Sequence, residues 1–461
     1  MEKLSVKEAA AACGGTLLWG DGNTVIAGVT TDSRKSGENM LFIPLEGPTF
    51  DGHAFIRAAF DTGAVAALTH KDVEPFCDGA LIRVKDTKQA LADLARYYLQ
   101  KFDIPVVAVT GSVGKTTTKD MVAAALGEKY RVLKTQGNFN NDIGLPLTVF
   151  EIDRTHEIAV LEMGMNHFGE IRHLASIAHP DCALITNIGM AHIENLGSQE
   201  GILRAKLEVT SYFDESNTLF LNGDDAMLST VEAAGYSIVR FGTGAGCAYR
   251  AENIVLDADS VAFDAIYDGG GQHIVVNLPG MHNVYNALAA FAAAKHYGVP
   301  DAAIATGLAA FTPSKMRMDI RRFGGITLIN DCYNASPDSM RAALAVLAGT
   351  EAKRRVAILG DILEMGSFGP AAHEALGEDA ARCADVLLTT GTDAAHLHSG
   401  ALAAGMQVGN ALHFANNKEV IAALGDILRE GDAVLVKASR GMQFEQIALG
   451  IEKLFLDTEN K

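Results

Sequence analysis

The chain has 461 residues, of which 48% are hydrophobic and 20% are charged. This composition excludes a disordered chain, and at about 150 residues for each domain it predicts roughly three domains. Its 38 basic residues face 56 acidic ones, and the net charge of −18 argues against a general nucleic-acid coat or a binder of anionic membranes. A phosphorylated ligand must therefore be held in a local pocket by backbone N–H groups, a few Lys or Arg side chains, or metal ions.

The N-terminal residues and the cysteines predict the cellular compartment, which is the cytoplasm. Residues 1–8 include no apolar signal-peptide core, and no run reaches the ~18 apolar residues that a membrane span requires. The six cysteines are far apart and form no Cys-x-x-Cys, which argues against a zinc ribbon or a disulfide framework. They are Cys13, Cys77, Cys182, Cys247, Cys332 and Cys383. We expect a cytoplasmic monomer with reduced thiols, no nucleic-acid partner and no membrane span.

Taken in chain order, the predicted elements fall into three blocks, 1–102, 103–313 and 314–461. The first holds short strands, a turn at 46–48 and a helix at 87–99. A proline at 105 ends that helical region and opens the second block. The third block begins near Ser314.

In the second and third blocks, short Val/Ile-rich runs alternate with Ala-rich stretches, which is the βαβ pattern of parallel α/β domains. A strand at 106–109 precedes a helix at 119–126, and a strand at 356–359 precedes a helix at 371–381. The glycine cluster at 268–271 predicts the tip of a hairpin.

The strongest local signal is a glycine-rich turn between the buried strand at 106–109 and the helix that follows. Its glycines let backbone N–H groups point at a phosphate, and the helix N-terminus adds positive partial charge. Lys115 can reach the β- and γ-phosphates, and the Thr116 hydroxyl can bind Mg²⁺. The predicted ATP-binding residues of this loop are Gly111, Ser112, Val113, Gly114, Lys115, Thr116 and Thr117.

The loop departs from the standard G-x-x-x-x-G-K-[ST], because Val109 stands where the first glycine would be. The structural alternative is an ordinary strand–turn–helix junction with a chance Gly-Lys-Thr. The strand before the loop and the helix after it disfavour that alternative. Among phosphate-loop proteins, a GTPase or a motor is disfavoured because no guanine-reading Asn-Lys-x-Asp is evident.

Two residues downstream, Glu162 and His192, are candidate metal ligands. Glu162 follows a strand at 157–161, and a carboxylate at the C-terminal end of a parallel strand points into the ligand crevice. His192 follows a strand-like segment at 183–189, and for it a structural and a ligating role stay open. Lys206 lies in a helix at 200–208 and, taken alone, is typical of a surface lysine.

These segments, taken together, resemble the Mur ligases of bacterial cell-wall synthesis. The resemblance covers essentially the whole chain. The segments that carry it are 110–117, 162–164, 187–192, the helix around Lys206, 280–287, 316–319 and 330–335. It implies a small α/β domain for the UDP substrate, a central P-loop-type parallel-sheet ATPase domain and a C-terminal Rossmann-like α/β domain that binds the acceptor.

Within the family, four segments resemble the branch that joins D-alanyl-D-alanine to UDP-N-acetylmuramoyl-tripeptide. They are 137–147, 331–337, 359–366 and 436–440. The branch that adds the preceding amino acid often carries Asp-Asn-Pro-Arg, and the comparable stretch at 389–394 lacks it. Ser336 stands where many relatives have Asn, a mild departure that leaves the reaction class unchanged.

Three alternatives remain beside this interpretation. One is the amino-acid-adding branch, and another is a folylpolyglutamate synthase. The segments within 31–53 resemble the uridine-nucleotide-binding domain of the Mur ligases, and this disfavours the folate enzyme. The third is a nucleotide-switched binding module that uses the loop only as a sensor.

The resemblance implies a reaction through an acyl phosphate, ATP and two Mg²⁺ as cofactors, and carbamylation of Lys206. The catalytic residues it implies are Lys115, Glu162, His192, Lys206 and Arg317. The metal residues are Thr116, Glu162, His192 and Lys206. The nucleotide residues outside the loop are Asn283, Asn286, Arg317 and Asp331. The substrate residues are Ser33, Arg34, Gly47, Asn138, Asn140, Asn141, Asn334 and Ser439.

Overall fold

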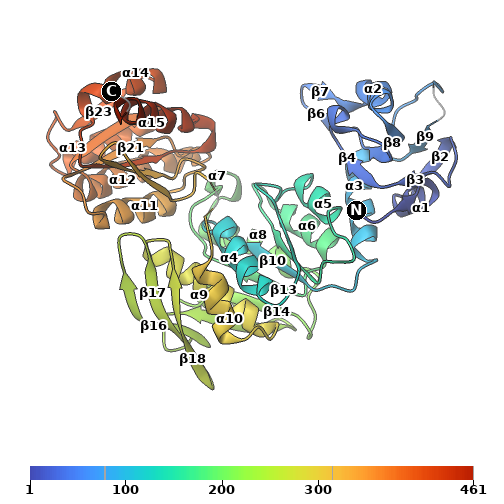
Figure 1. The fold of residues 1–461 in the computed structure, drawn as a ribbon, viewed down its shortest axis with the longest axis horizontal. Coiled ribbons are helices and arrows are strands. Elements are labelled where there is room, and N and C mark those ends of the chain that lie inside the picture. Colours follow the sequence, from blue (N-terminus) through green and yellow to red (C-terminus); the bar gives the residue numbers. More distant parts are fainter. Residues whose placement is uncertain (77–78, 314, 460–461) are drawn as a thin grey trace.

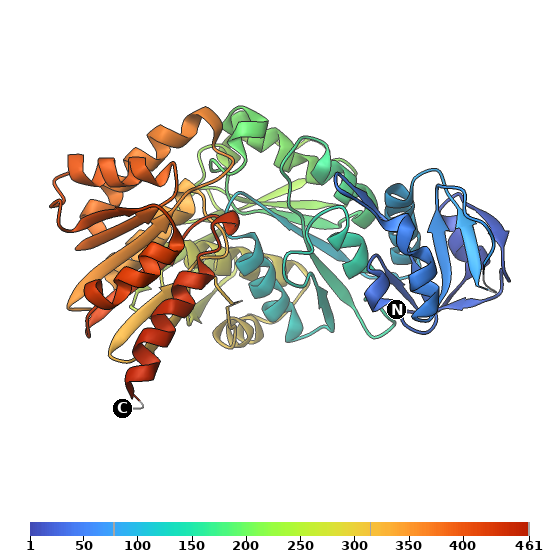
Figure 2. The ribbon, with the colours of Figure 1, turned by 90° about the horizontal axis from the view of Figure 1, so that it is seen from above.

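The computed structural model describes residues 1–76, 79–313 and 315–459. Three α/β domains follow one another, and the first and last lie at opposite ends of the middle one (Figure 1, Figure 2). The predicted three-domain α/β architecture is confirmed. Cys77 and Ser314, where the third block was predicted to begin, lie outside the described residues, and the five described cysteines are free. No helix in the described ranges is both long and apolar enough to cross a membrane.

The N-terminal domain is built on a five-stranded sheet of order β2-β9-β8-β5-β4, parallel except at β2. Helix α3 (Thr87–Leu99) confirms the predicted helix, and the Asp86 side chain caps its first turn. Tyr98 of α3 donates a hydrogen bond to the Ile152 carbonyl, which fastens this domain to the next. The other elements are β1 (Leu4–Ser5), α1 (Val6–Ala12), β2 (Thr16–Trp19), β3 (Val25–Ile26), β4 (Gly28–Thr30), β5 (Met40–Phe42), β6 (Glu46–Gly47), β7 (Phe50–Asp51), α2 (Ile56–Asp61), β8 (Ala64–Thr69) and β9 (Ala80–Arg83).

The middle domain holds a nine-stranded sheet of order β11-β12-β10-β13-β14-β15-β16-β17-β18. It is parallel from β11 to β16, and an antiparallel hairpin of β17 and β18 follows, which confirms the predicted hairpin tip. The strands are β10 (Val106–Thr110), β11 (Val132–Lys134), β12 (Ile158–Glu162), β13 (Cys182–Ile185), β14 (Thr218–Asn222), β15 (Ser237–Gly242), β16 (Tyr249–Leu256), β17 (Val261–Tyr267) and β18 (Gly270–Val276). The helices are α4 (Lys115–Gly127), α5 (Gly144–Val149), α6 (Glu170–Ala178), α7 (Ile193–Leu196), α8 (Gln199–Leu207), α9 (Met281–His296) and α10 (Asp301–Ala309).

Successive residues of β10 point to opposite faces of this sheet, as strand geometry requires. Val107 and Val109 pack with α4 and the alanine-rich α9, whereas Val106 and Ala108 join the core on the other face. Both faces are therefore covered, which explains why the strand is apolar throughout.

The C-terminal domain has a six-stranded sheet of order β19-β20-β24-β21-β22-β23, parallel except at β19. Residues of α11, α12 and α13 pack on one face, and residues of α14 and α15 on the other. The strands are β19 (Asp319–Phe323), β20 (Ile326–Asn330), β21 (Arg354–Gly360), β22 (Val386–Thr390), β23 (Ala411–Phe414) and β24 (Asp432–Lys437). The helices are α11 (Pro337–Gly349), α12 (Gly369–Cys383), α13 (Ala394–Ala403), α14 (Asn417–Ile427) and α15 (Glu445–Glu459).

One predicted strand is shorter than expected. The segment at 183–189 leaves the sheet after Ile185: the Thr186 N–H still donates to the Thr110 carbonyl of β10 at 3.1 Å, and from there the chain bonds to the glycine-rich loop. The Thr186 hydroxyl donates to the Val113 carbonyl at 2.6 Å, and Asn187 bonds to the loop as well.

Candidate active site

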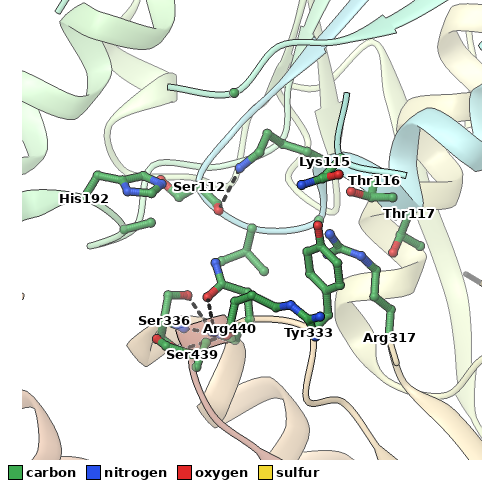
Figure 3. Close-up of a pocket in the computed structure, with 18 of the residues that line it drawn as sticks. Ser112, Lys115, Thr116, Thr117, His192, Arg317, Tyr333, Ser336, Ser439 and Arg440 are labelled. Atoms are coloured by element: carbon green, nitrogen blue, oxygen red, sulfur yellow. Dashed lines mark hydrogen bonds between the residues drawn. The ribbon is translucent and has the colours of Figure 1, made fainter. Parts of the chain in front are cut away.

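A cavity of about 490 Å³ lies between the middle and C-terminal domains, at the carboxyl ends of their central strands. Figure 3 shows Lys115, Thr116 and Thr117 on one side, and Ser336, Ser439 and Arg440 on the other, with Tyr333 and Arg317 between them. Most of the predicted site residues line this cavity. They are Ser112, Val113, Gly114, Lys115, Thr116, Thr117, Asn138, Asn140, Asn141, Glu162, His192, Asn283, Asn286, Arg317, Asp331, Asn334 and Ser439.

Five predicted residues do not line the cavity: Gly111, Lys206, Ser33, Arg34 and Gly47. The last three belong to the N-terminal domain, and no described residue of 1–102 reaches the cavity. The Arg34 side chain is exposed and pairs with Asp32 of its own turn.

The backbone of the glycine-rich loop explains its two glycines. Gly111 has φ +148°, and a Cβ there would lie 1.9 Å from Thr186 Oγ1. Gly114 has φ +85°, and a Cβ there would lie 2.8 Å from Asn286 Oδ1. Both positions combine a backbone conformation that favours glycine with a close approach that excludes a side chain.

Asn187, which the sequence argument did not single out as a site residue, holds the loop in place. Its carbonyl accepts from the Ser112 N–H at 3.0 Å, and its Oδ1 accepts from the Val113 N–H at 2.9 Å. Its position just after β13, the strand beside β10, is the signal by which it could have been found.

Lys115 is folded back onto the loop in this structure. Its Nζ donates to the carbonyls of Gly111 at 2.7 Å and Ser112 at 3.3 Å (Figure 3). Burial lowers the pKa of Lys115; Glu162 opposes that shift and Arg317 adds to it. The Lys115 ammonium therefore lies on the loop, with the Glu162 carboxylate and the Arg317 guanidinium close enough to shift its pKa.

Glu162 ends β12 with a buried side chain, 1% exposed. Asn140 Nδ2 donates to its Oε1 at 2.7 Å. Its Oε2 has no hydrogen-bond partner among the described residues, and neither has the buried Ser112 Oγ of the loop. Two unpartnered oxygens beside a phosphate loop match the preference of Mg²⁺ for oxygen ligands, so these residues fit a cation.

His192 precedes the short helix α7 and reaches across to the C-terminal domain. Its Nδ1 lies 2.5 Å from Glu364 Oε2. Burial and then Lys115 lower the pKa of His192, while Glu364 opposes the shift. Glu364 lies in the segment 359–366, which carries the resemblance, but was not predicted as a site residue, since its partner is far away in the sequence.

Lys206 does not behave as a surface lysine. It is 1% exposed within α8, and its ammonium has no hydrogen bond or ion pair with any residue in the described ranges. Burial, and then the charge of Lys115, place its pKa well below the usual value for lysine. These conditions favour the neutral amine.

The predicted nucleotide residues on α9 bind one another and the loop helix. Asn283 Nδ2 donates to the Pro279 carbonyl at 2.8 Å, and Asn286 Nδ2 donates to Asn283 Oδ1 at 3.1 Å. Thr118 Oγ1 of α4 donates to Asn286 Oδ1 at 3.1 Å. These bonds fix the cavity wall that lies against the loop.

On the C-terminal side, Asp331 is held by the buried Lys437, whose Nζ lies 2.5 Å from Asp331 Oδ2. The Arg317 guanidinium lies 4.0 Å from the centre of the Tyr333 ring, within the range of a cation–π contact. Lys437 and Tyr333 were not predicted as site residues, although both stand in segments that carry the resemblance.

The amides and hydroxyls expected to bind substrate make hydrogen bonds within their own domains. Asn141 Oδ1 accepts from the Gly144 N–H at 2.8 Å, at the start of α5. Ser439 Oγ accepts from the Leu363 N–H at 2.9 Å, and Asn334 Oδ1 accepts from the Arg440 N–H at 3.4 Å. These bonds position the polar side chains along the cavity. They leave part of the hydrogen-bonding capacity of each side chain unused.

Sequence profiles of three domains match this chain in order. The profile described as Mur ligase family, catalytic domain, matches residues 25–99. The Mur ligase middle domain matches residues 109–294. The profile described as Mur ligase, glutamate ligase domain, matches residues 316–440.

Named relatives match over almost the full length. The UDP-N-acetylmuramoyl-tripeptide–D-alanyl-D-alanine ligase of Bacillus subtilis is 41% identical, over 97% of this chain and 98% of that protein. A crystal structure of MurF from Acinetobacter baumannii has a TM-score of 0.91 at 30% identity, with 99% of each chain covered. The MurF ligase from Thermotoga maritima in complex with ADP has a TM-score of 0.83 at 27% identity, over 94% of this chain and 98% of that one.

Proposed function

The chain belongs to the Mur ligase family, and we propose that it joins D-alanyl-D-alanine to UDP-N-acetylmuramoyl-tripeptide at the expense of ATP. It is an ATP-dependent ligase of peptidoglycan precursor synthesis. The observation that carries the proposal is the single cavity in which the phosphate loop, Glu162 and the cationic side chains of the C-terminal domain meet.

The chemistry requires activation of a carboxylate, because joining a carboxylate to an amine in water is unfavourable. Transfer of the γ-phosphoryl group of ATP to the substrate carboxylate releases ADP and gives an acyl phosphate. The amine of D-alanyl-D-alanine then attacks the acyl carbon and phosphate leaves. Negative charge gathers in both steps, so catalysis depends on preorganised donors and cations. Lys115, the loop N–H groups and Arg317 are placed to supply them.

The donor set supports a cation site. Thr116 and Glu162 provide oxygens beside the loop, and His192 and a modified Lys206 complete the residues that would hold two Mg²⁺. When bound, Mg²⁺ offsets charge on phosphate and carboxylate oxygens. A hydrogen bond from Asn140 orients the Glu162 carboxylate for this role. It holds one carboxylate oxygen, and the other, Oε2, has no hydrogen-bond partner among the described residues.

The environment of Lys206 supports its carbamylation. A neutral amine attacks CO₂ to give a carbamate and a proton, and a lowered pKa supplies that amine. The product replaces an amine, whose protonated form Lys115 would repel, with an anion that Lys115 attracts. The carbamate oxygens are ligands suited to Mg²⁺.

The remaining assignments divide the substrates among the domains. The domain at 1–102 binds the UDP portion through Ser33, Arg34 and Gly47, and 103–313 binds ATP. The domain at 314–461 binds the acceptor, with Asn334 and Ser439 on the cavity wall. In the middle domain, Asn138, Asn140 and Asn141 contact the tripeptide end. The protein acts as a cytoplasmic monomer.

The test is phosphate release from ATP with UDP-N-acetylmuramoyl-tripeptide as donor. Three arms compare D-alanyl-D-alanine, meso-diaminopimelate and no acceptor. We expect turnover only in the first arm. Turnover with UDP-N-acetylmuramoyl-dipeptide and meso-diaminopimelate would instead support the amino-acid-adding alternative.

A further inference from the structure

The contact between His192 and Glu364 joins two domains at the edge of the reaction cavity. His192 stands before α7 in the middle domain, and Glu364 follows β21 in the C-terminal domain. Besides the 2.5 Å contact of Nδ1 with Oε2, the Glu194 N–H donates to the Glu364 carbonyl at 3.4 Å. Both residues line the cavity, so this contact is part of its wall.

Both partners adopt a backbone conformation that non-glycine residues rarely take. His192 has φ +63° and Glu364 has φ +62°. Such strain costs about 1–3 kcal/mol for each residue and persists where the surroundings enforce it, often at functional sites. Here the two residues with this backbone conformation contact each other across the interface.

The geometry assigns the two nitrogens of the His192 ring different tasks. Because a carboxylate only accepts, the nitrogen facing Glu364 carries the hydrogen, and Nε2 is left with its lone pair free. A second partner that accepts from one ring nitrogen is the usual way in which proteins orient a metal-binding histidine. The carboxylate here comes from a different domain than the histidine.

We propose that Glu364 is a positioning residue for the metal ligand His192, so that the cation site is complete only when the C-terminal domain is seated against the middle domain. The inference rests on the metal role given to His192 under the proposed function. It adds a consequence for the reaction order: the phosphate loop belongs to the middle domain, whereas the full cation site forms only with the domain that brings the acceptor.

Mn²⁺ binding to the full chain with a non-hydrolysable ATP analogue tests the proposal. Electron paramagnetic resonance of free Mn²⁺ gives the affinity, and pulsed measurements detect coupling to a histidine nitrogen. In Glu364→Ala we expect affinity about 10–100-fold lower and a weaker nitrogen coupling. Glu364→Gln, whose amide oxygen still accepts from the ring, should recover most of both.

Asp338→Ala is the matched control, because Asp338 makes another contact between the same domains, accepting from the Met190 N–H at 3.3 Å, and alanine removes it. Its Mn²⁺ affinity should stay within about threefold of the unchanged chain. Equal losses in Asp338→Ala and Glu364→Ala would overturn the proposal in favour of general domain docking. If Glu364→Ala bound Mn²⁺ as well as the unchanged chain while His192→Ala lost affinity, the proposal would be overturned and the proposed function would stay intact. Unchanged Mn²⁺ binding in His192→Ala would instead remove the metal role of His192 on which the proposal rests.

Discussion

Asn140 holds one oxygen of Glu162 at 2.7 Å, and the other oxygen, Oε2, is buried without a partner among the described residues. A buried carboxylate oxygen left unbonded is costly unless a ligand or ion completes it. The pair therefore combines an orienting amide with an open coordination position at the end of β12.

Glu162→Gln should lower the turnover of ATP-dependent ligation at least about 100-fold, since an amide keeps the size of the side chain but loses the charge that attracts a cation. Asn140→Ala, which frees the carboxylate to rotate, should cost about 10–100-fold. Steady-state kinetics across a Mg²⁺ titration measure both.

Glu157→Gln is the control for these variants, because Glu157 is an exposed carboxylate just before the opposite end of the same strand. Its turnover should match that of the unchanged chain. Full activity of Glu162→Gln at every Mg²⁺ concentration would remove Glu162 from the cation site.

Gly114→Ala should weaken ADP binding at least tenfold. Its φ of +85° costs an L-residue about 1–2 kcal/mol, and the added Cβ would lie 2.8 Å from Asn286 Oδ1. The loop must therefore move away from its phosphate-binding shape. Calorimetric titration with ADP gives the affinity.

Gly127→Ala is the matched comparison at the other end of α4. A Cβ there meets nothing within 4 Å, so ADP affinity should not change and the helix should gain up to about 1 kcal/mol. If Gly114→Ala bound ADP as well as Gly127→Ala does, the loop backbone would not be the phosphate cradle.

The sequence predicted those features of the site that depend on local pattern. The phosphate loop lies between a buried strand and a helix, and Glu162 ends its strand as expected. Helix α3 was predicted with its observed bounds, because the aspartate before it and the apolar spacing are both local signals.

Features that depend on tertiary packing could not be predicted in this way. Lys206 has the pattern of a surface lysine and is buried because α8 packs against α6 and α7 of the middle domain. Glu364 meets His192 through the approach of two domains, a contact that no local spacing encodes. The chain also leaves β13 early, after Ile185, where the Asn187 carbonyl accepts from the Ser112 N–H of the loop at 3.0 Å.

Lys206→Ala should reduce turnover at least about 100-fold, because it removes an anionic oxygen ligand together with the lysine that forms it. Added formate or acetate should recover part of the activity by entering the vacated space as a carboxylate. Carbon-13 NMR after exposure to labelled bicarbonate should give a carbamate signal in the unchanged chain and none in the variant.

Lys206→Arg controls for charge, since arginine stays cationic and forms no carbamate. Its turnover should fall as far as that of Lys206→Ala, without recovery by formate. Undiminished, substrate-dependent turnover in either variant would contradict the ligase mechanism proposed for this site.

His282 predicts a pH dependence of stability. Burial lowers the pKa of His282 to about 4, with Asp331 opposing the shift and Lys437 adding to it. The unfolded chain takes up a proton at about pH 6.5 and the folded chain only near 4, so the contribution to stability is complete above pH 6.5 and is lost as the pH falls toward 4. Between pH 7 and pH 5 this group should remove about 2 kcal/mol from the free energy of unfolding.

Denaturant unfolding of the unchanged chain and of His282→Asn at both pH values measures the effect, because the variant keeps all other titrating groups. The variant should lose less stability than the unchanged chain over this interval, by about that amount. Equal losses in the two proteins would mean that His282 titrates at its usual pH and that the cavity wall around α9 is open to water.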